Sequence, residues 1–444
     1  MKPIKIAFAL IFLSLSGLWL LADTLLPEPM NYFAFRGVFV QYSGVIAIGV
    51  MSVAMILALR PVWLEARLNG LDKMYRLHKW LGITALVFSV LHWWWALGTK
   101  WMVGWGWLER PQRGPGSQEQ LPVIEQWFRD QRGLAESLGE WAFYIAAALM
   151  ILALVKWFPY QLFKKTHKWL AAVYLVLAFH SVILMDFDYW RQPVGWVMAA
   201  LLQAGTLSAI LVLLGRIGRG RQVRGTIQSI SSYPGVHAIE GSIRLDQSWP
   251  GHEPGQFAFV TSNRSEGAHP YTIASAWDPK KPCLTFIVKE LGDWTEKLHS
   301  RLHVGMPVTV EGPYGCFHFK DHQPRQIWIG AGIGITPFIA RMKHLAKHPG
   351  NQKIDLFHVT ADYDQQVIDK LCADAEAANI RLHLIVTPKD GRLTPEQIRE
   401  TVPEWLLSSI WFCGPSGFGE HLHRDFIDHG LPGEDFHQEL FAMR

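Results

Sequence analysis

Six long apolar runs fill the first half of the chain and constrain its fold more than any other feature. They cover residues 6–22, 37–59, 74–98, 138–155, 167–185 and 194–214. Each is close to the ~20 residues that an α-helix needs to cross a bilayer. The first run follows Lys2 and Lys5 without a small-residue cleavage site, so we interpret it as a retained span and not as a signal peptide. Residues 1–215 are therefore predicted to form a six-helix transmembrane bundle.

Positive charge is concentrated in the loops that follow the second, fourth and sixth runs. Because lysine and arginine favour the cytoplasmic side, these three loops predict one topology, in which both termini and the second half of the chain are cytoplasmic. The residues concerned are Arg60, Arg67, Lys73 and Arg76; Lys156, Lys164, Lys165 and Lys168; and Arg216, Arg219, Arg221 and Arg224.

The composition of the chain excludes several classes of function. A formal net charge of +4 over 444 residues is too small to indicate nucleic-acid binding, and no segment interleaves basic and aromatic residues densely. The four cysteines all lie beyond residue 215 and form no CxxC pair, which argues against disulfides and structural zinc. They are Cys283, Cys316, Cys372 and Cys413.

Histidines in the apolar half occur at only four positions, although the chain has 19 of them. His78 and His92 share the third run, and His167 and His180 share the fifth. Separations of 14 and 13 residues place the members of each pair roughly 20 Å apart along a helix. We expect His78 to face His167 and His92 to face His180, each pair ligating the iron of a b-type haem at both axial positions.

Two alternatives to this interpretation remain open. The histidines could instead be polar residues that hydrogen-bond one helix to another. The spacing of His167 and His180 on the fifth run is also irregular. Thirteen residues leave an angular offset of roughly 140° between them on an ideal helix. Either the fifth helix is irregular, or its histidines approach the two haems from different directions.

Beyond residue 215 the pattern changes to short strands, glycines and charges. Segments 222–230, 237–244, 256–261, 271–274, 284–288 and 307–310 predict a small antiparallel barrel. A buried strand at 326–329 then enters a glycine-rich turn at 330–337 and a helix at 338–347, and strands follow at 354–359, 381–386 and 410–413. This second pattern is typical of a parallel nucleotide-binding sheet. The predicted domains are residues 1–215, 216–322 and 323–444.

The segment Tyr75-Arg76-Leu77-His78-Lys79-Trp80 of the first half resembles the bacterial predicted ferric reductases. Several motifs in the second half resemble those of the wider NADPH oxidase and ferric reductase family. The motif His269-Pro270-Tyr271-Thr272-Ile273-Ala274-Ser275 resembles the family's flavin motif. The segment 289–295 is similar to the one that cradles the FAD pyrophosphate, and 311–315 to the turn between the two cytoplasmic lobes. The segments 330–337 and 413–415 resemble those that bind NAD(P)H. The haem-histidine spacings are also those of the family.

The resemblance implies a ferredoxin-reductase-like module with FAD in the barrel and NADPH or NADH on the parallel sheet. Tyr271 would lie against the isoalloxazine and Thr272 beside its hydride-accepting nitrogen, whereas their simpler interpretation is as ordinary barrel residues. The implied cofactor-binding residues are His269, Pro270, Tyr271, Thr272, Ser275, Lys289, Gly292, Trp294, Thr295, Gly330, Gly332, Gly334, Thr336, Pro337, Gly414, Pro415 and Phe441.

The resemblance also assigns roles near the reacting groups. Cys413 would lie close to the reacting nicotinamide carbon, although an inert buried cysteine is an equally ordinary interpretation. Glu439 and Phe441 match the C-terminal stretch whose aromatic ring covers the flavin. Arg36 matches an arginine near the oxygen-reducing pocket of oxidases, whereas Ala96 stands where oxidases carry a histidine and Val173 where an aromatic residue often lies between the haems.

The implied function is an oxidoreductase of a bacterial-type inner membrane that moves electrons from NAD(P)H through FAD and two haems to an outer acceptor, oxygen or ferric iron. Asp362 follows the second nucleotide strand without a neighbouring arginine, which favours NADH without excluding NADPH. Alternatives are a quinone-linked flavocytochrome that reduces a periplasmic protein, a haem-free tethered flavin reductase, and a channel with a vestigial flavin domain. The expected partners are the bilayer and a small acceptor, with no nucleic acid and no obligatory protein partner.

Overall fold

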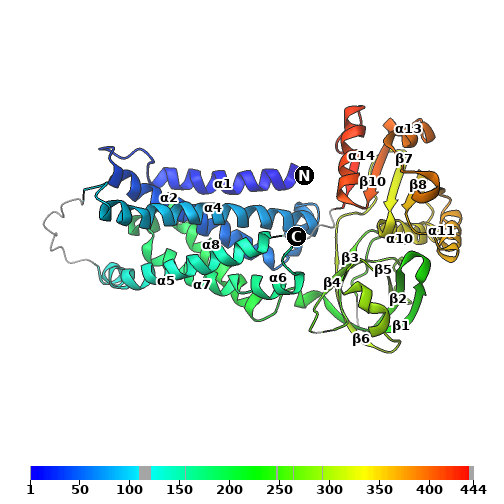
Figure 1. Cartoon of the computed structure of the whole chain (residues 1–444), viewed down its shortest axis with the longest axis horizontal. Helices are drawn as coiled ribbons and strands as arrows, with labels where there is room; N and C mark the ends of the chain where they lie inside the picture. Colours follow the sequence, from blue (N-terminus) through cyan, green and yellow to red (C-terminus); the bar gives the residue numbers. More distant parts are fainter. Residues whose placement is uncertain are drawn as a thin grey trace. The chain divides into compact units, whose positions relative to one another are not determined.

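The computed structural model of the chain describes residues 2–109, 122–155, 157–246, 249–263, 265–292 and 294–439. These residues form two compact units, one of residues 1–68 and 73–217 and the other of residues 69–72 and 218–444. The first unit is helical, and the second combines two sheets with helices (Figure 1).

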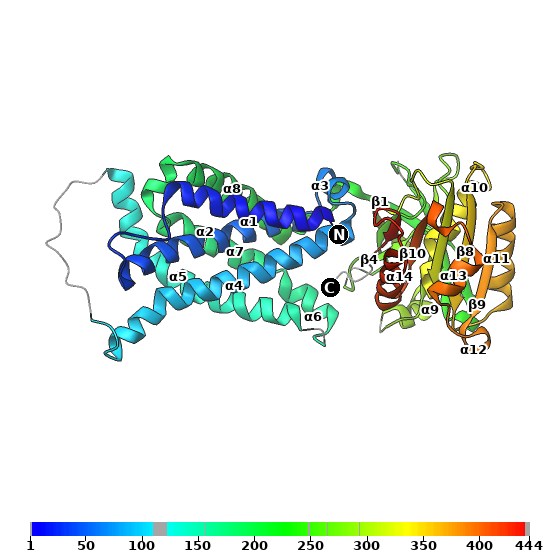
Figure 2. The same ribbon diagram turned by 90° about the horizontal axis from the view of Figure 1, so that it is seen from above.

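The first unit contains the six predicted spans, and the prediction of a six-helix bundle is confirmed. Its long helices run side by side in both views (Figures 1 and 2). They are α1 (Lys2–Ala22), α2 (Tyr32–Ala58), α4 (Leu71–Gly104), α5 (Val123–Leu154), α6 with α7 (Tyr160–His167 and Leu170–Leu184) and α8 (Pro193–Leu213), with short helices α3 (Val62–Arg67) and η1 (Phe187–Arg191) between them.

Burial is distributed in this unit as a bilayer requires. Helix α2 is the most enclosed, whereas α1 exposes Ile6, Leu10 and Leu13 by more than half of each side chain. Apolar side chains on the outer faces are stable in lipid, because lipid tails do not penalise their exposure, and every helix satisfies its own backbone. Helix α5 begins at Val123, earlier than the predicted start at 138. Its first turns carry charged helix-forming residues that a hydropathy pattern does not register.

The second unit begins with the predicted antiparallel barrel. Its strands are β1 (Gln222–Tyr233), β2 (Ala238–Leu245), β3 (Phe257–Thr261), β4 (His269–Thr272), β5 (Cys283–Lys289) and β6 (Pro307–Tyr314). They pair in the order β4-β3-β6-β1-β2-β5, and an antiparallel bridge between Ile273 and Phe286 joins the two edge strands. Ile273, Leu284 and Val310 are fully buried at its centre. Closure by this bridge leaves few exposed strand edges.

A parallel sheet follows, as predicted. Its strands are β7 (Arg325–Ala331), β8 (Lys353–Thr360), β9 (Arg381–Val386), β10 (Ser408–Cys413) and β11 (Phe436–Gln438), in the order β11-β10-β7-β8-β9. Side chains of α10 (Thr336–Leu345) and α11 (Gln365–Ala377) pack on one face, and those of α13 (Pro395–Thr401) and α14 (Ser416–Asp428) on the other. Figure 2 shows α11 and α14 on opposite sides of the sheet. The strand order reverses between β7 and β10, and such a switch point is where open α/β sheets bind ligands.

Candidate functional site

The four histidines of the helical unit meet in the two predicted pairs. The ring centres of His78 and His167 lie 5.9 Å apart with an interplanar angle of 66°. Those of His92 and His180 lie 6.2 Å apart with an angle of 83°. The third span therefore faces the fifth at two levels.

The fifth span is irregular, and this irregularity accommodates the thirteen-residue spacing of its histidines. Helix α6 ends at His167, and α7 begins at Leu170. Between them, Trp169 N donates to Thr166 O at 3.0 Å and Ala171 N donates to Lys168 O at 3.1 Å. These are i→i+3 bonds, which wind the chain more tightly than an α-helix and change the direction of the following side chains.

Three of the four imidazoles are oriented by backbone carbonyls of neighbouring helices. Nδ1 of His78 lies 2.9 Å from Ala54 O, Nδ1 of His92 lies 3.0 Å from Val40 O, and Nδ1 of His180 lies 2.8 Å from Ala135 O. A carbonyl oxygen only accepts, so each Nδ1 carries the proton and donates it. The lone pair of Nε2 is then available to a metal, which is the arrangement typical of metal-bound histidines.

His167 differs from the other three histidines. Its Nδ1 is buried and has no hydrogen-bond partner among the described residues. A buried polar nitrogen without a partner is costly unless a bound group satisfies the ring.

Two glycines make room for the outer histidine pair. A Cβ on Gly139 of α5 would lie 1.9 Å from Nδ1 of His180, and one on Gly44 of α2 would lie 3.2 Å from Cε1 of His92. Any side chain at residue 139 would therefore displace the imidazole. No pattern in a single sequence predicted these two roles.

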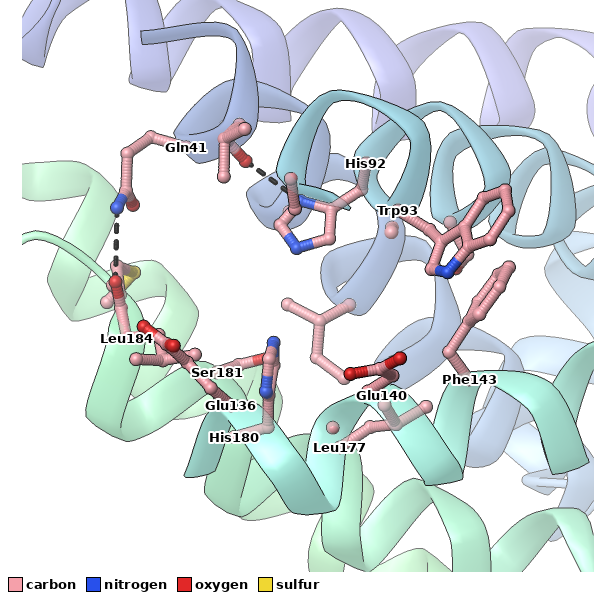
Figure 3. Close-up of a pocket in the computed structure, with 18 of the residues that line it drawn as sticks. Gln41, His92, Trp93, Glu136, Glu140, Phe143, Leu177, His180, Ser181 and Leu184 are labelled. Carbon is pink, nitrogen blue, oxygen red and sulfur yellow. Dashed lines mark hydrogen bonds between the residues drawn. The ribbon is translucent and has the colours of Figure 1, made fainter. Parts of the chain in front are cut away.

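The paired rings fit a haem. An imidazole nitrogen lies about 2 Å from a metal ion that it ligates, so two rings on opposite sides of one ion have centres about 6 Å apart. Both observed separations match this value. A cavity of about 510 Å³ surrounds the outer pair, with His92 and His180 facing each other across it (Figure 3). This volume is typical of cofactor sites.

Charged residues line the same cavity. Arg36 of α2 donates from Nε to Trp95 O at 3.1 Å and from Nη2 to Ala96 O at 2.9 Å. Glu136 and Glu140 of α5 point their carboxylates toward the cavity (Figure 3). Sequence reasoning missed Glu140, although an acidic residue inside a predicted span is itself a functional signal. Besides Arg36, the charged lining residues are Lys100, Arg132, Glu136 and Glu140.

Aromatic stacking organises the predicted flavin motif on β4. The ring of His269 stacks on Trp294 with centres 5.4 Å apart and an interplanar angle of 8°, and it also stacks on Tyr271. Burial raises the pKa of Tyr271 to about 12, so its hydroxyl stays protonated at neutral pH. The structure thus brings His269, Tyr271 and Trp294 together, with Pro270 and Thr272 on the same strand.

The other predicted flavin residues lie around this strand. Ser275 Oγ accepts a hydrogen bond from Thr285 N at 3.1 Å, which fixes the end of the motif against β5. Thr295 Oγ1 accepts from Leu291 N and Gly292 N at 2.9 and 3.1 Å and closes a tight turn after β5. Lys289, at the end of β5, forms an ion pair through Nζ with Asp362, which follows β8 of the parallel sheet.

The predicted nicotinamide residues converge at the switch point. Gly330 lies at the end of β7, Gly332 and Gly334 lie in the turn Gly332–Ile335, and α10 begins with Thr336 and Pro337. Facing them, Gly414 and Pro415 follow the end of β10.

Cys413 is the last residue of β10 and is fully buried. Burial, together with the nearby carboxylate of Glu439, raises the pKa of the Cys413 thiol well above its usual range. Cys413 is therefore a neutral thiol and not a nucleophilic thiolate. Glu439 is buried beyond β11, and Phe441 lies outside the described residues.

Two family models match the chain. The model described as ferric reductase like transmembrane component matches residues 43–178, and the one described as FAD-binding domain matches residues 238–318. The first match includes His78, His92 and His167 and ends two residues before His180. The second covers the flavin motif on β4.

Individual proteins also resemble the chain. Ferric reduction oxidase 4 of Arabidopsis thaliana is 28% identical over 201 residues, which are 41% of this chain and 26% of that protein. A superoxide-generating NADPH oxidase heavy chain of Dictyostelium discoideum is 23% identical over 337 residues, 66% of this chain and 62% of that protein. The ferredoxin reductase in carbazole 1,9a-dioxygenase aligns with 50% of this chain and 69% of its own, at 17% identity and a TM-score of 0.43. The chain thus covers only about a quarter of the plant oxidase.

Proposed function

Because this chain belongs to the NADPH oxidase and ferric reductase family, we propose that it moves electrons from NAD(P)H through FAD and two b-type haems to a small acceptor across the membrane. The single observation that carries the proposal is the pairing of four histidines at two levels, with ring centres 5.9 and 6.2 Å apart. Hydrogen-bonded helix packing alone does not require two matched imidazole pairs.

The chain's own residues would hold each haem. His78 with His167, and His92 with His180, would each bind one haem through their imidazoles, while backbone carbonyls hold three of the rings in the ligating orientation. A haem with two imidazole ligands exchanges single electrons and has no open coordination position. The acceptor would therefore be reduced without bonding to iron.

The second unit would collect electrons from the nicotinamide cofactor. When bound, FAD would supply the chemistry that links two-electron transfer from NAD(P)H to one-electron centres. Tyr271, Thr272 and the His269–Trp294 stack would line the flavin. The glycine turn at the N-terminus of α10 would receive the nucleotide phosphates through backbone amides. The Cys413 thiol, kept neutral by burial, would lie beside the nicotinamide without reacting.

Charge distribution supports one orientation of the protein. We propose a bacterial-type inner membrane with both termini and the second unit in the cytoplasm. Lysines and arginines follow the second, fourth and sixth spans, and none occurs in residues 23–31 between α1 and α2. His92 and His180 then lie at the outer level, where the acceptor would approach.

The acceptor is proposed to be oxygen or a ferric chelate. Arg36 is held by Trp95 O and Ala96 O at the cavity, and Lys100 adds a second positive charge that would attract an anionic chelate, whereas Arg132 is paired with Glu136 at 3.5 Å. Ala96 lacks the imidazole that oxidases of this family carry at the equivalent position, which favours the chelate.

The experiment follows electrons in the purified full-length protein. NADH or NADPH is added without oxygen while flavin and haem absorbance are recorded, and then oxygen or a ferric chelate is added and haem reoxidation is timed. We expect flavin reduction to precede haem reduction, and reoxidation by the chelate to be faster than by oxygen. Haem that stays oxidised while flavin is reduced would contradict the proposed route. Reoxidation that requires a quinone would favour the quinone-linked alternative.

A further inference from the structure

Two turns approach each other closely at the carboxyl edge of the parallel sheet. A Cβ on Gly334 would lie 2.2 Å from Cys413 O, and one on Gly414 would lie 2.7 Å from Cβ of Ala331. Only glycine fits at these two positions. In sheets of this kind a dinucleotide lies across the crevice, with its pyrophosphate at the helix N-terminus and one ribose over the end of the neighbouring strand. Here the neighbouring strand is β8, which ends at Thr360.

The turn that follows β8 is ordered by its own side chains. Thr360 Oγ1 donates to Asp362 O at 2.9 Å and accepts from Asp362 N at 3.2 Å. Asp364 caps α11 by accepting from Gln366 N at 3.0 Å and Val367 N at 3.3 Å. Two carboxylates are therefore held at the point where the sheet would receive the adenosine ribose.

Two cations near this turn, Lys289 and Lys370, are already engaged. Lys289 Nζ, at the end of barrel strand β5, forms an ion pair with Asp362, and the two side chains are only 20% and 30% exposed. Residues 360–369 include three aspartates and no lysine or arginine. The next cation, Lys370, contacts Tyr233 Oη at 2.6 Å and Glu240 Oε2 at 2.8 Å. A 2′-phosphate beside Asp362 would thus meet two cations, Lys289 and Lys370, that already have carboxylate partners.

We propose that Asp362, positioned by Lys289, accepts a hydrogen bond from the ribose 2′-hydroxyl and makes NADH the preferred donor over NADPH. This inference rests on the proposed function and specifies its nucleotide. A carboxylate favours the diol of NADH because it accepts from a hydroxyl. It disfavours NADPH because a phosphate monoester carries about −1.5 to −2 charges at pH 7. Asp364 adds to the repulsion.

The ion pair makes a reversal of preference testable. Replacing the Asp362 carboxylate with an amide leaves the Lys289 ammonium without its anion, and that ammonium can then pair with a 2′-phosphate. The variant Asp362→Asn should therefore gain NADPH activity and lose part of its NADH activity. Adding Lys289→Met should remove the gain with NADPH.

The experiment measures flavin reduction in the full-length protein at a series of NADH and NADPH concentrations, without oxygen. We expect the wild type to show a kcat/KM for NADH at least about tenfold above that for NADPH, and Asp362→Asn to reduce this ratio by about tenfold. The FAD content of each variant is measured, because Lys289 is also a candidate FAD contact. Asp369→Asn is the matched control, since Asp369 is exposed on α11 and carries the same charge. Its ratio should stay unchanged.

A second readout does not depend on flavin chemistry. AMP and adenosine 2′,5′-bisphosphate are tested as competitors, and the wild type should bind AMP more tightly, with Asp362→Asn reversing the order. Equal use of NADH and NADPH by the wild type, or an unchanged ratio in Asp362→Asn, overturns the inference but leaves the proposed function intact. Reduction of the flavin by neither nucleotide overturns the proposed function itself.

Discussion

His92 and His180 face each other across a cavity in the helical unit, with ring centres 6.2 Å apart, and each is held from behind by a backbone carbonyl of another helix. The second ring nitrogen of each histidine points into the cavity (Figure 3). Two imidazoles fixed in this way are prepared to ligate one metal ion before it arrives, which lowers the entropic cost of binding.

Removing either imidazole should remove one haem. For His180→Leu or His92→Leu we expect the haem content to fall by about half, because one axial ligand of the outer site is lost and a bis-imidazole site does not tolerate leucine. Reduction of the flavin by the nicotinamide nucleotide should persist. Haem extraction and flavin bleaching measure the two quantities. Ser181→Ala, at a neighbouring cavity position, is the control. Unchanged haem in both histidine variants would refute the ligand assignment.

A methyl group on Gly139 should have a similar effect without changing any ligand. The added Cβ would lie 1.9 Å from Nδ1 of His180, so Gly139→Ala must displace the imidazole or the helix. Gly133→Ala, on the same helix with nothing within 4 Å of its Cβ, is the matched control. We expect the first variant to lose most of the outer haem and the second to retain it. Equal haem spectra for the two variants would show that Gly139 does not support the site.

A methyl group on Gly334 should affect only the binding and positioning of the nicotinamide nucleotide. Its Cβ would lie 2.2 Å from Cys413 O, which forces the turn away from β10. Gly334→Ala should lower the kcat/KM for flavin reduction by about a hundredfold, because a small misplacement of the hydride donor costs about this much. FAD and haem contents should not change. The control is Gly350→Ala, whose Cβ would meet Leu345 at an ordinary 3.4 Å. Normal activity of Gly334→Ala would exclude this turn from nucleotide binding.

His358 should make the stability of the second unit depend on pH. Burial, with a smaller effect of the Lys289 charge, lowers the pKa of His358 from 6.5 to about 4, while Nδ1 donates to Gly330 O at 3.0 Å. Between pH 6.5 and 4 the unfolded chain therefore binds a proton that the folded chain does not, so stability falls as the pH is lowered through this window.

The variant His358→Asn keeps an amide donor and removes this titration. When the pH is lowered from 7 to 5, we expect the wild type to lose roughly 2 kcal/mol more of its free energy of unfolding than this variant. Thermal unfolding of the full chain in detergent across this range gives the measurement. A slope equal to that of the wild type would mean that His358 is not buried as a neutral ring.

The sequence predicted features that depend on local pattern. The six spans follow from apolar runs, and the barrel and parallel sheet follow from strand length and turn residues, so most boundaries were correct to within a few residues. The exceptions are α5, which begins at Val123 instead of 138, α4, which ends at Gly104 instead of 98, and the fifth span, which begins at Tyr160 instead of 167. The pairing of His92 with His180 was also predictable, since the fourteen- and thirteen-residue spacings place the histidines at matching depths.

Features that depend on long-range packing were not predictable. The break after His167 arises from two i→i+3 bonds whose formation depends on how neighbouring helices pack. Gly139 matters because it meets His180 on another helix, and Lys289 because it meets Asp362, 73 residues further along the chain. A single sequence carries no signal for such partners.

The number and spin state of the haems in the purified full-length protein test the proposed electron route most directly. We predict two haems per chain, both low-spin because two imidazoles ligate each iron, and a loss of one haem when either histidine of a pair is replaced. A single haem, a high-spin iron with an open position, or no haem at all would contradict the route.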